Sequence, residues 1–169
     1  MKQFKTLLFA ALLFIGATSY TNAQSKIAHI NTQELMKAMP EMTSAQAELD
    51  KLRKTYETEI QTMATELQTK MKQYQSEVDS KTDEENAKRA QEVQGMQQSI
   101  RDYQTNAQQD LSKKEADLLK PIYDKAEAAI KKVAKAQGYQ YVLDSTQGTG
   151  VLVADGKDLM ADVKKELGF

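Results

Sequence analysis

The stretch LDKLRKTYETEIQTMATELQTKMKQYQSEV, residues 49–78, decides the fold, because its apolar residues follow one another at steps of three and four. The pattern returns to register every eleven residues, as Leu49, Ile60 and Met71 illustrate. Eleven residues make three turns at close to the natural helical pitch, which predicts a nearly straight stripe on an α-helix. Polar residues between the stripe positions leave one narrow face to be buried. The stripe comprises Leu49, Leu52, Tyr56, Ile60, Met63, Leu67, Met71, Tyr74 and Val78.

A polar segment, SKTDEEN at residues 80–86, ends this stripe. Thr82 and Glu85 have the spacing of a capping box, so one helix can end near Ser80 and another can begin at Thr82. A second apolar stripe then runs from Ala87 through Met96 and Tyr103 to Leu118. Two narrow stripes joined by a polar turn predict an antiparallel helical hairpin over residues 43–137, about 55 Å long. One continuous coiled-coil rod is the alternative.

The first 23 residues have the features of a secretory signal peptide. Lys2 and Lys5 precede an apolar run at residues 7–17, and small residues lead to Ala23. The run is too short to span a bilayer permanently. We therefore expect cleavage between Ala23 and Gln24 and export of the mature chain. Cysteine is absent, which excludes a lipoprotein anchor and disulfide bonds.

Composition places the mature chain among long-helix proteins of one domain. The full sequence has 23 Lys+Arg and 24 Asp+Glu, and removal of Lys2 and Lys5 takes the net charge from −1 to −3. A slightly acidic chain gives no support for nucleic-acid binding, which requires a basic face.

The chain before the hairpin predicts a strand at residues 26–31 and a short helix capped by Asn31. Pro40 ends this helix, because the residue before a proline is pushed out of helical geometry. Thr43 then begins the first long helix, with Gln46 as its capping-box partner.

The chain after the hairpin predicts a second group of short elements. Pro121 predicts a break or kink in the returning helix at Lys120, and Gly138 predicts its end. Residues 139–144 and 149–154 read as two strands joined by a turn. A final amphipathic helix is predicted at residues 158–167.

These elements divide the mature chain, residues 24–169, into a small body and an arm. The body comprises residues 24–43 and 122–169, and the arm comprises residues 44–121. About 65 body residues are marginal for a single core, which predicts oligomerisation through the body. The arm is expected to be the less stable part, especially at its tip, residues 71–94.

Four segments resemble the Skp-type, or OmpH-like, periplasmic chaperones of outer-membrane proteins. They are KIAHINTQELMKAMPEM (26–42), SAQAELDKL (44–52), PIYDKAEAAIKKVAKAQGYQYVLD (121–144) and VLVADGKDL (151–159). The resemblance implies a mainly α fold with a small β body that forms a homotrimer. It also implies three helical-hairpin arms that enclose a cavity for unfolded clients, without ATP or any cofactor.

The sequence departs from that family at two points. Many members are strongly basic and contact anionic lipid, whereas this chain is slightly acidic, which argues against membrane-surface contact. Met160 stands where the family usually has a threonine that caps the last helix, and Asp158 is expected to take over that role.

Catalytic and metal-binding patterns are missing from the sequence. His29 is the single histidine and lies in a predicted strand, which indicates a structural role. Residues 148–150 lack the lysine and the helix of a phosphate loop. The acidic residues at positions 79–85 do not have the spacing of a calcium-binding loop. We therefore expect a protein that is not an enzyme and binds no metal.

Flexible thioether and aromatic side chains on the stripes are the candidate client contacts. They are Met63, Met71, Tyr74, Met96 and Tyr103. The alternative is that they simply fill the surface between the two helices.

The predicted function is an ATP-independent periplasmic holdase that binds unfolded outer-membrane proteins and supports their biogenesis by weak multivalent contact. A structural coiled-coil spacer or envelope adaptor without an unfolded client is the alternative, and an enzyme ranks third.

Overall fold

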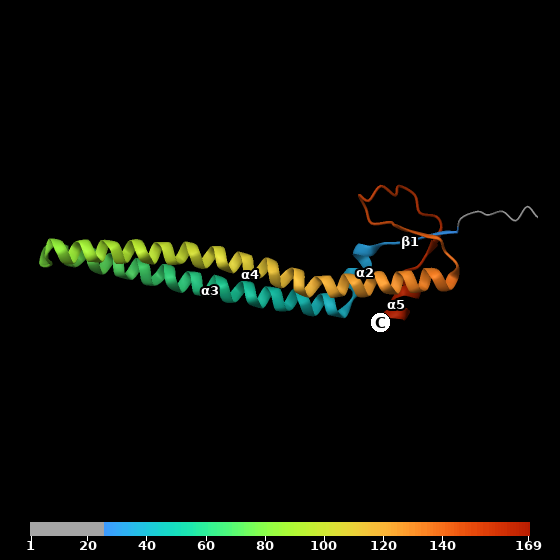
Figure 1. The fold of residues 1–169 in the computed structure, drawn as a ribbon, viewed down its shortest axis with the longest axis horizontal. Helices are drawn as coiled ribbons and strands as arrows, with labels where there is room; N and C mark the ends of the chain where they lie inside the picture. The colour runs from blue at the N-terminus through green and yellow to red at the C-terminus, as the bar shows by residue number, and fades with distance from the viewer. Residues whose placement is uncertain (1–25) are drawn as a thin grey trace, which may run out of the picture.

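The computed structural model describes residues 26–169, and two long helices dominate it (Figure 1). Helix α3 spans Pro40–Glu77 and α4 spans Asp83–Gln137, with a 3-10 turn, η1, at Val78–Ser80 between them. The helices lie antiparallel as a long arm, and the remaining elements gather at its open end as a small body (Figure 1). This arrangement confirms the hairpin and excludes the continuous rod.

The turn at the tip of the arm is built as predicted. The Thr82 hydroxyl accepts a hydrogen bond from the Glu85 N–H at 3.2 Å, and the Glu85 carboxylate accepts one from the Thr82 N–H at 3.1 Å. This capping box satisfies two backbone donors that the start of α4 would otherwise expose. The Asn86 side chain also donates to the Val78 carbonyl at 3.0 Å, which ties the new helix to the end of the old one.

The first long helix, α3, begins three residues earlier than predicted, at Pro40 and not at Thr43. Strand β1 spans Ile27–Ile30 and helix α2 spans Thr32–Ala38, with the Asn31 side chain accepting from the Glu34 N–H at 2.9 Å. The predicted start at Thr43 with a Gln46 box is wrong, because α3 already begins at Pro40. Proline suits this position, since the N–H that it lacks would have no partner in a first helical turn.

Of the break or kink predicted at Lys120, the break is wrong, because helix α4 continues through Pro121. Proline removes one backbone hydrogen bond, but the residues after it are held by packing. Ile122 and Ala126 are 8% and 4% exposed and belong to the hydrophobic core. The predicted end at Gly138 is confirmed, because Gly138 takes the left-handed conformation at φ 73°. The Tyr139 N–H donates a hydrogen bond to the Ala134 carbonyl at 2.9 Å, at the C-terminal end of the helix.

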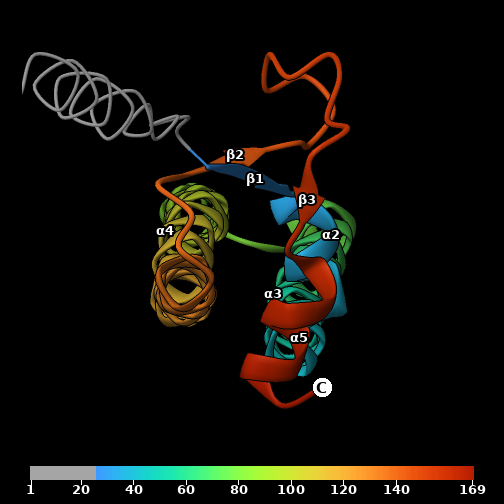
Figure 2. The ribbon, with the colours of Figure 1, turned by 90° about the vertical axis from the view of Figure 1, so that its right-hand side faces the viewer.

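The sheet differs from the predicted hairpin of strands. Strand β2 spans Tyr141–Asp144, β3 spans Lys157–Asp158, and both pair parallel to β1 in the order β2-β1-β3. Residues 149–154 form no strand and belong to a loop that leaves the sheet on the side away from the helices (Figure 2). A strand needs a hydrogen-bonded neighbour, and no strand in the described chain pairs with this apolar run. The Leu152 side chain of the run is 97% exposed.

The core of the body lies between the sheet and the helices. Helix α5 spans Met160–Leu167, and its N-cap residue is Leu159, which makes no side-chain capping bond. Asp158, the residue before the N-cap, accepts a hydrogen bond from the Met160 N–H at 2.8 Å, so it satisfies one backbone donor at the start of the helix. Side chains from β1, α2 and the α5 region are almost fully buried, and alanines of α4 pack against them. The largest side chains that are under 2% exposed are those of Ile30, Leu35, Met39, Leu159 and Val163.

Candidate functional site

The seam, the surface where α3 and α4 face each other, changes character along the arm. Near the body, Leu49 and Ala107 are 5% and 6% exposed. Between residues 51 and 106 no side chain is buried, and the seam residues Ile60, Met63 and Leu67 are only half-buried. The apolar residues of the stripe therefore form the predicted contact between the helices. Because their side chains are only half-buried, a partner could still reach them.

The candidate client contacts lie in three different settings. Met63 and Met96 are half-buried on facing helices, whereas Met71 is 45% exposed. Tyr74 and Tyr103 both contact side chains of the opposite helix. The structure thus places none of the five in the core, and the two tyrosines contribute to the arm itself.

Tyr103 belongs to an aromatic contact near the body. Its ring meets the Tyr56 ring edge to face, with centroids 5.9 Å apart and planes at 71°. The Tyr56 hydroxyl donates to the Asp110 carboxylate at 2.5 Å, and this hydrogen bond raises the pKa of Tyr56 above its ordinary value. Edge-to-face rings and a charge-assisted hydrogen bond both favour one register of the two helices.

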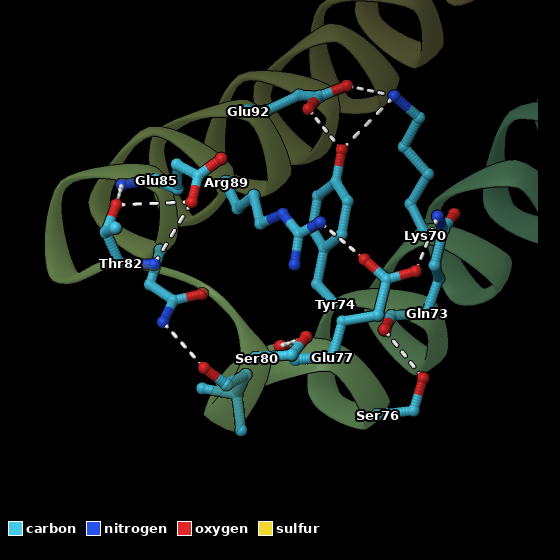
Figure 3. A network of polar contacts seen from close by, with 12 residues as sticks. Lys70, Gln73, Tyr74, Ser76, Glu77, Ser80, Thr82, Glu85, Arg89 and Glu92 are labelled. Atoms are coloured by element: carbon cyan, nitrogen blue, oxygen red, sulfur yellow. Dashed lines mark hydrogen bonds and ion pairs between the residues drawn. The ribbon is translucent and has the colours of Figure 1, made fainter.

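Tyr74 belongs to a polar network close to the tip (Figure 3). Its hydroxyl donates to the Glu92 carboxylate, which also forms an ion pair with Lys70. The Arg89 guanidinium lies 4.6 Å from the Tyr74 ring centroid and pairs with Glu77. Hydrogen bonds from Lys70 and Tyr74 hold the pKa of Glu92 below its ordinary value. The network therefore keeps its acidic groups ionised and paired across the two helices.

A groove on one side of the arm, about 530 Å³, was not predicted from the sequence. Met96 lines it together with Thr62, Thr65 and Thr69 of α3. These threonines belong to a row in which each hydroxyl donates to the carbonyl four residues earlier. Because the hydroxyls bond to their own helix, the methyl groups are what the row can offer to a partner. The available signal was the spacing of Thr55, Thr58, Thr62, Thr65 and Thr69 at steps of three and four.

The outer face of the sheet carries a second exposed apolar group. Ile27 and Tyr141 are register partners with 50% and 59% exposure, and Leu143 next to them is 44% exposed. The adjoining loop adds Leu152 and Val153, at 97% and 74% exposure. This set of five residues is called the outer sheet patch below.

His29 connects the sheet to both ends of that loop. Its Nδ1 lies 3.3 Å from the Ser145 hydroxyl, and its Nε2 lies 3.2 Å from the Gly156 carbonyl oxygen. Gly156 also passes close to β1, since an added Cβ would lie 3.7 Å from the Ile27 carbonyl oxygen. These contacts give His29 the structural role that the sequence indicated.

Within residues 26–169, no group of three His, Cys, Asp or Glu side chains is arranged to hold a metal ion. In the same range, no helix is both long enough and apolar enough to cross a bilayer. The features that the structure places on the described chain are three surfaces: the seam, the groove beside it and the outer sheet patch.

Comparison with known proteins gives one family and one fold. The model of the family described as "Outer membrane protein (OmpH-like)" matches residues 26–167. The crystal structure of a proposed outer membrane chaperone (OmpH-like) from Caulobacter crescentus is similar, with a TM-score of 0.75 at 15% identity. The alignment covers 86% of this chain and 85% of that one. No curated protein matches the chain.

Proposed function

Because the chain belongs to the OmpH-like outer membrane protein family, we propose that it is an ATP-independent periplasmic holdase chaperone. In this proposal the arms of an oligomer surround an unfolded outer-membrane protein, prevent its aggregation and release it without a chemical step. The family and the shared fold support a chaperone kind of function in the periplasm. The holdase mechanism is argued from the arm.

The accessible seam of the arm is the observation that carries the proposal. A rigid spacer would gain from a fully buried seam, as at Leu49 and Ala107, because burial of apolar surface is what stabilises a helix pair. Here the seam farther out is half-buried over more than half of the length of α3. Methionine and tyrosine at such positions suit weak contact with many different chains.

Self-association through the body, as a homotrimer, is the second part of the proposal. The outer sheet patch contains Leu152 at 97% and Val153 at 74% exposure, next to the open edges of a three-stranded sheet. Exposed apolar side chains beside unpaired strand edges are typical of protein interfaces.

Export remains a prediction from the sequence, because the signal peptide and its cleavage between Ala23 and Gln24 lie outside the described residues. The division into a body of residues 24–43 and 122–169 and an arm of residues 44–121 is likewise a proposal about roles. It assigns self-association to the body and client binding to the arm.

An aggregation assay tests the holdase. Several unrelated β-barrel outer-membrane proteins are diluted from urea with and without the mature protein, and light scattering is followed with and without ATP. We expect suppression for every barrel and no effect of ATP. Stoichiometric binding of one folded envelope partner, without suppression, would instead support a spacer.

A shortened arm provides the matched control for that assay. Deletion of residues 61–105 joins Ile60 through a short turn to Asn106, which the Tyr56–Asp110 contact places opposite each other in the hairpin. We expect this variant to keep the oligomer, since the body is intact, and to lose suppression. Full suppression by the shortened protein would contradict a role for the arm.

The outer sheet patch is tested by sedimentation of Leu152→Asp with Val153→Asp. Two charges in a contact that excludes water should dissociate the oligomer, while the folded body keeps its helical circular dichroism. Gln147→Asp, an exposed change in the same loop, is the control and should sediment like the wild type. An unchanged oligomer with both charges present would exclude this patch as the interface.

A further inference from the structure

Polar contacts between the arm helices are concentrated at two levels. Toward the body, Glu48 pairs with Lys114 at 2.7 Å and Tyr56 donates to Asp110 at 2.5 Å, a set called the base clamp. Toward the tip lies the network of Figure 3, called the tip clamp. It comprises Lys70, Tyr74, Glu77, Arg89 and Glu92. The two clamps hold the helices together at both ends of the outer arm.

The mid-arm, residues 57–69 and 93–102, lies between the clamps and has a different kind of contact. In this part of the described chain no hydrogen bond or ion pair crosses from α3 to α4. Its cohesion comes from six apolar seam residues, none of which is buried. They are Ile60, Met63, Leu67, Val93, Met96 and Ile100. The mid-arm is therefore the part of the outer arm where the two helices are joined by half-buried apolar contact alone.

The helices of the mid-arm also contain several residues that are unfavourable in a helix interior. Four threonines of the row, at 58, 62, 65 and 69, have β-branched side chains with low helix propensity, and their bonds to preceding carbonyls bend helices. On the facing helix, Gly95 has no atom within 4 Å of a Cβ built on it. Neither space nor a positive φ therefore requires glycine there, and glycine is among the least favourable residues in a helix interior.

We propose that the arm opens locally in the mid-arm while the base and tip clamps remain closed. This reverses the expectation from the sequence, which placed the weakest region at the tip. Opening would expose Met63, Leu67 and Met96 beside the threonine-lined groove, so the mid-arm would be where a client first gains apolar contact. The client half of this inference rests on the function proposed above, whereas the opening itself does not.

Amide hydrogen exchange of the client-free oligomer tests the opening. Local opening is expected to make peptides within residues 57–69 and 93–102 exchange faster than peptides within 72–78 and 86–92. Faster or equal exchange at the tip would overturn the proposal. Arg89→Ala with Glu92→Gln, which removes charges of the tip clamp, should move the fastest exchange to the tip.

A strengthened mid-arm tests the link to clients. Gly95→Ala should slow mid-arm exchange about fivefold, because alanine favours helix. Ser76→Ala, an exposed change near the tip, is the control and should leave mid-arm exchange unchanged. Weaker suppression of barrel aggregation by Gly95→Ala supports capture through the opened seam. Slowed exchange with full suppression would overturn the client half alone. Failure of the wild type to suppress aggregation would instead contradict the proposed function.

Discussion

The body and the arm of this protein use the same apolar residue types in opposite ways. In the body, Leu35 and Val163 are completely buried, and elements from both ends of the chain surround them. In the outer arm, Leu67 and Ile100 meet only the facing helix and stay half-buried. Between residues 51 and 106 each arm helix packs against one neighbouring helix, and none of its stripe residues is buried. The same apolar side chains therefore form a fixed core where several helices and strands surround them. They form an accessible surface where only one helix faces them.

The largest effect is expected from the same substitution made on the two sides of this comparison. Leu35→Ala leaves a cavity in a closed core and should lower the free energy of unfolding by about 2–5 kcal/mol. Leu67→Ala should cost only about 1 kcal/mol, since water already reaches the side chain. Urea unfolding followed by circular dichroism, at one protein concentration because the protein is proposed to be oligomeric, measures both. Equal losses for the two variants would show that the seam is packed as tightly as the core.

A smaller effect on stability is expected from a hydrogen-bonded carboxylate of the body, that of Asp144. Asp144, at the end of β2, accepts hydrogen bonds from the Thr32 hydroxyl and the Thr146 hydroxyl, both at 2.6 Å. Burial alone would raise the pKa of Asp144, but hydrogen bonds from Thr146 and Thr32 outweigh it and lower the pKa from 3.8 to about 2. A depressed pKa in the folded state stabilises the fold above the unfolded value of 3.8, and this stabilisation is lost as the pH falls toward 2.

Asp144→Asn should therefore cost on the order of 2 kcal/mol at neutral pH. The difference in stability between wild type and variant should shrink steadily as the pH is lowered from 5 to 2. Denaturation at a series of pH values measures it, and the variant itself corrects for the titration of all other carboxylates. A difference that stays constant with pH would mean that Asp144 contributes through its shape and not through its charge.

The arm was the part of the fold that the sequence predicted well, because its signals are local. The stripe at steps of three and four and the Thr82–Glu85 box act within one or two helical turns, and both were confirmed. The predicted strand at residues 149–154 failed for the opposite reason. A strand exists only with a partner, and no partner for this run lies in the described chain. The helix break predicted before Pro121 is wrong, because the packing of Ile122 in the core outweighs the tendency of proline to interrupt a helix.

The candidate site was predicted only in outline. The methionines and tyrosines of the stripes were found by their spacing. Met63, Met96 and the two tyrosines lie along the seam, whereas Met71 is 45% exposed. The pairing of Tyr74 with Glu92 and Arg89 could not be derived, because it depends on the register of two helices to within one residue. The threonine row was missed because threonine was counted as polar, although its hydroxyl bonds to its own helix and leaves a methyl group outside.

The smallest expected effect concerns Tyr56, which lies within the arm close to where the buried seam gives way to the accessible seam. Tyr56→Phe removes the hydrogen bond to Asp110 and keeps the edge-to-face contact with Tyr103, so the melting temperature should fall only slightly. Tyr56→Ala removes both contacts and should lower the melting temperature further. The hydrogen bond to Asp110 raises the pKa of Tyr56 above 10.0 in the folded state. The contribution of the hydroxyl is therefore complete below pH 10.0 and is lost as the pH rises through the raised value. The difference between wild type and Tyr56→Phe should vanish under strongly alkaline conditions. If the two variants melt alike, the ring contact contributes nothing, and the hydrogen bond alone marks where the buried seam ends and the accessible seam begins.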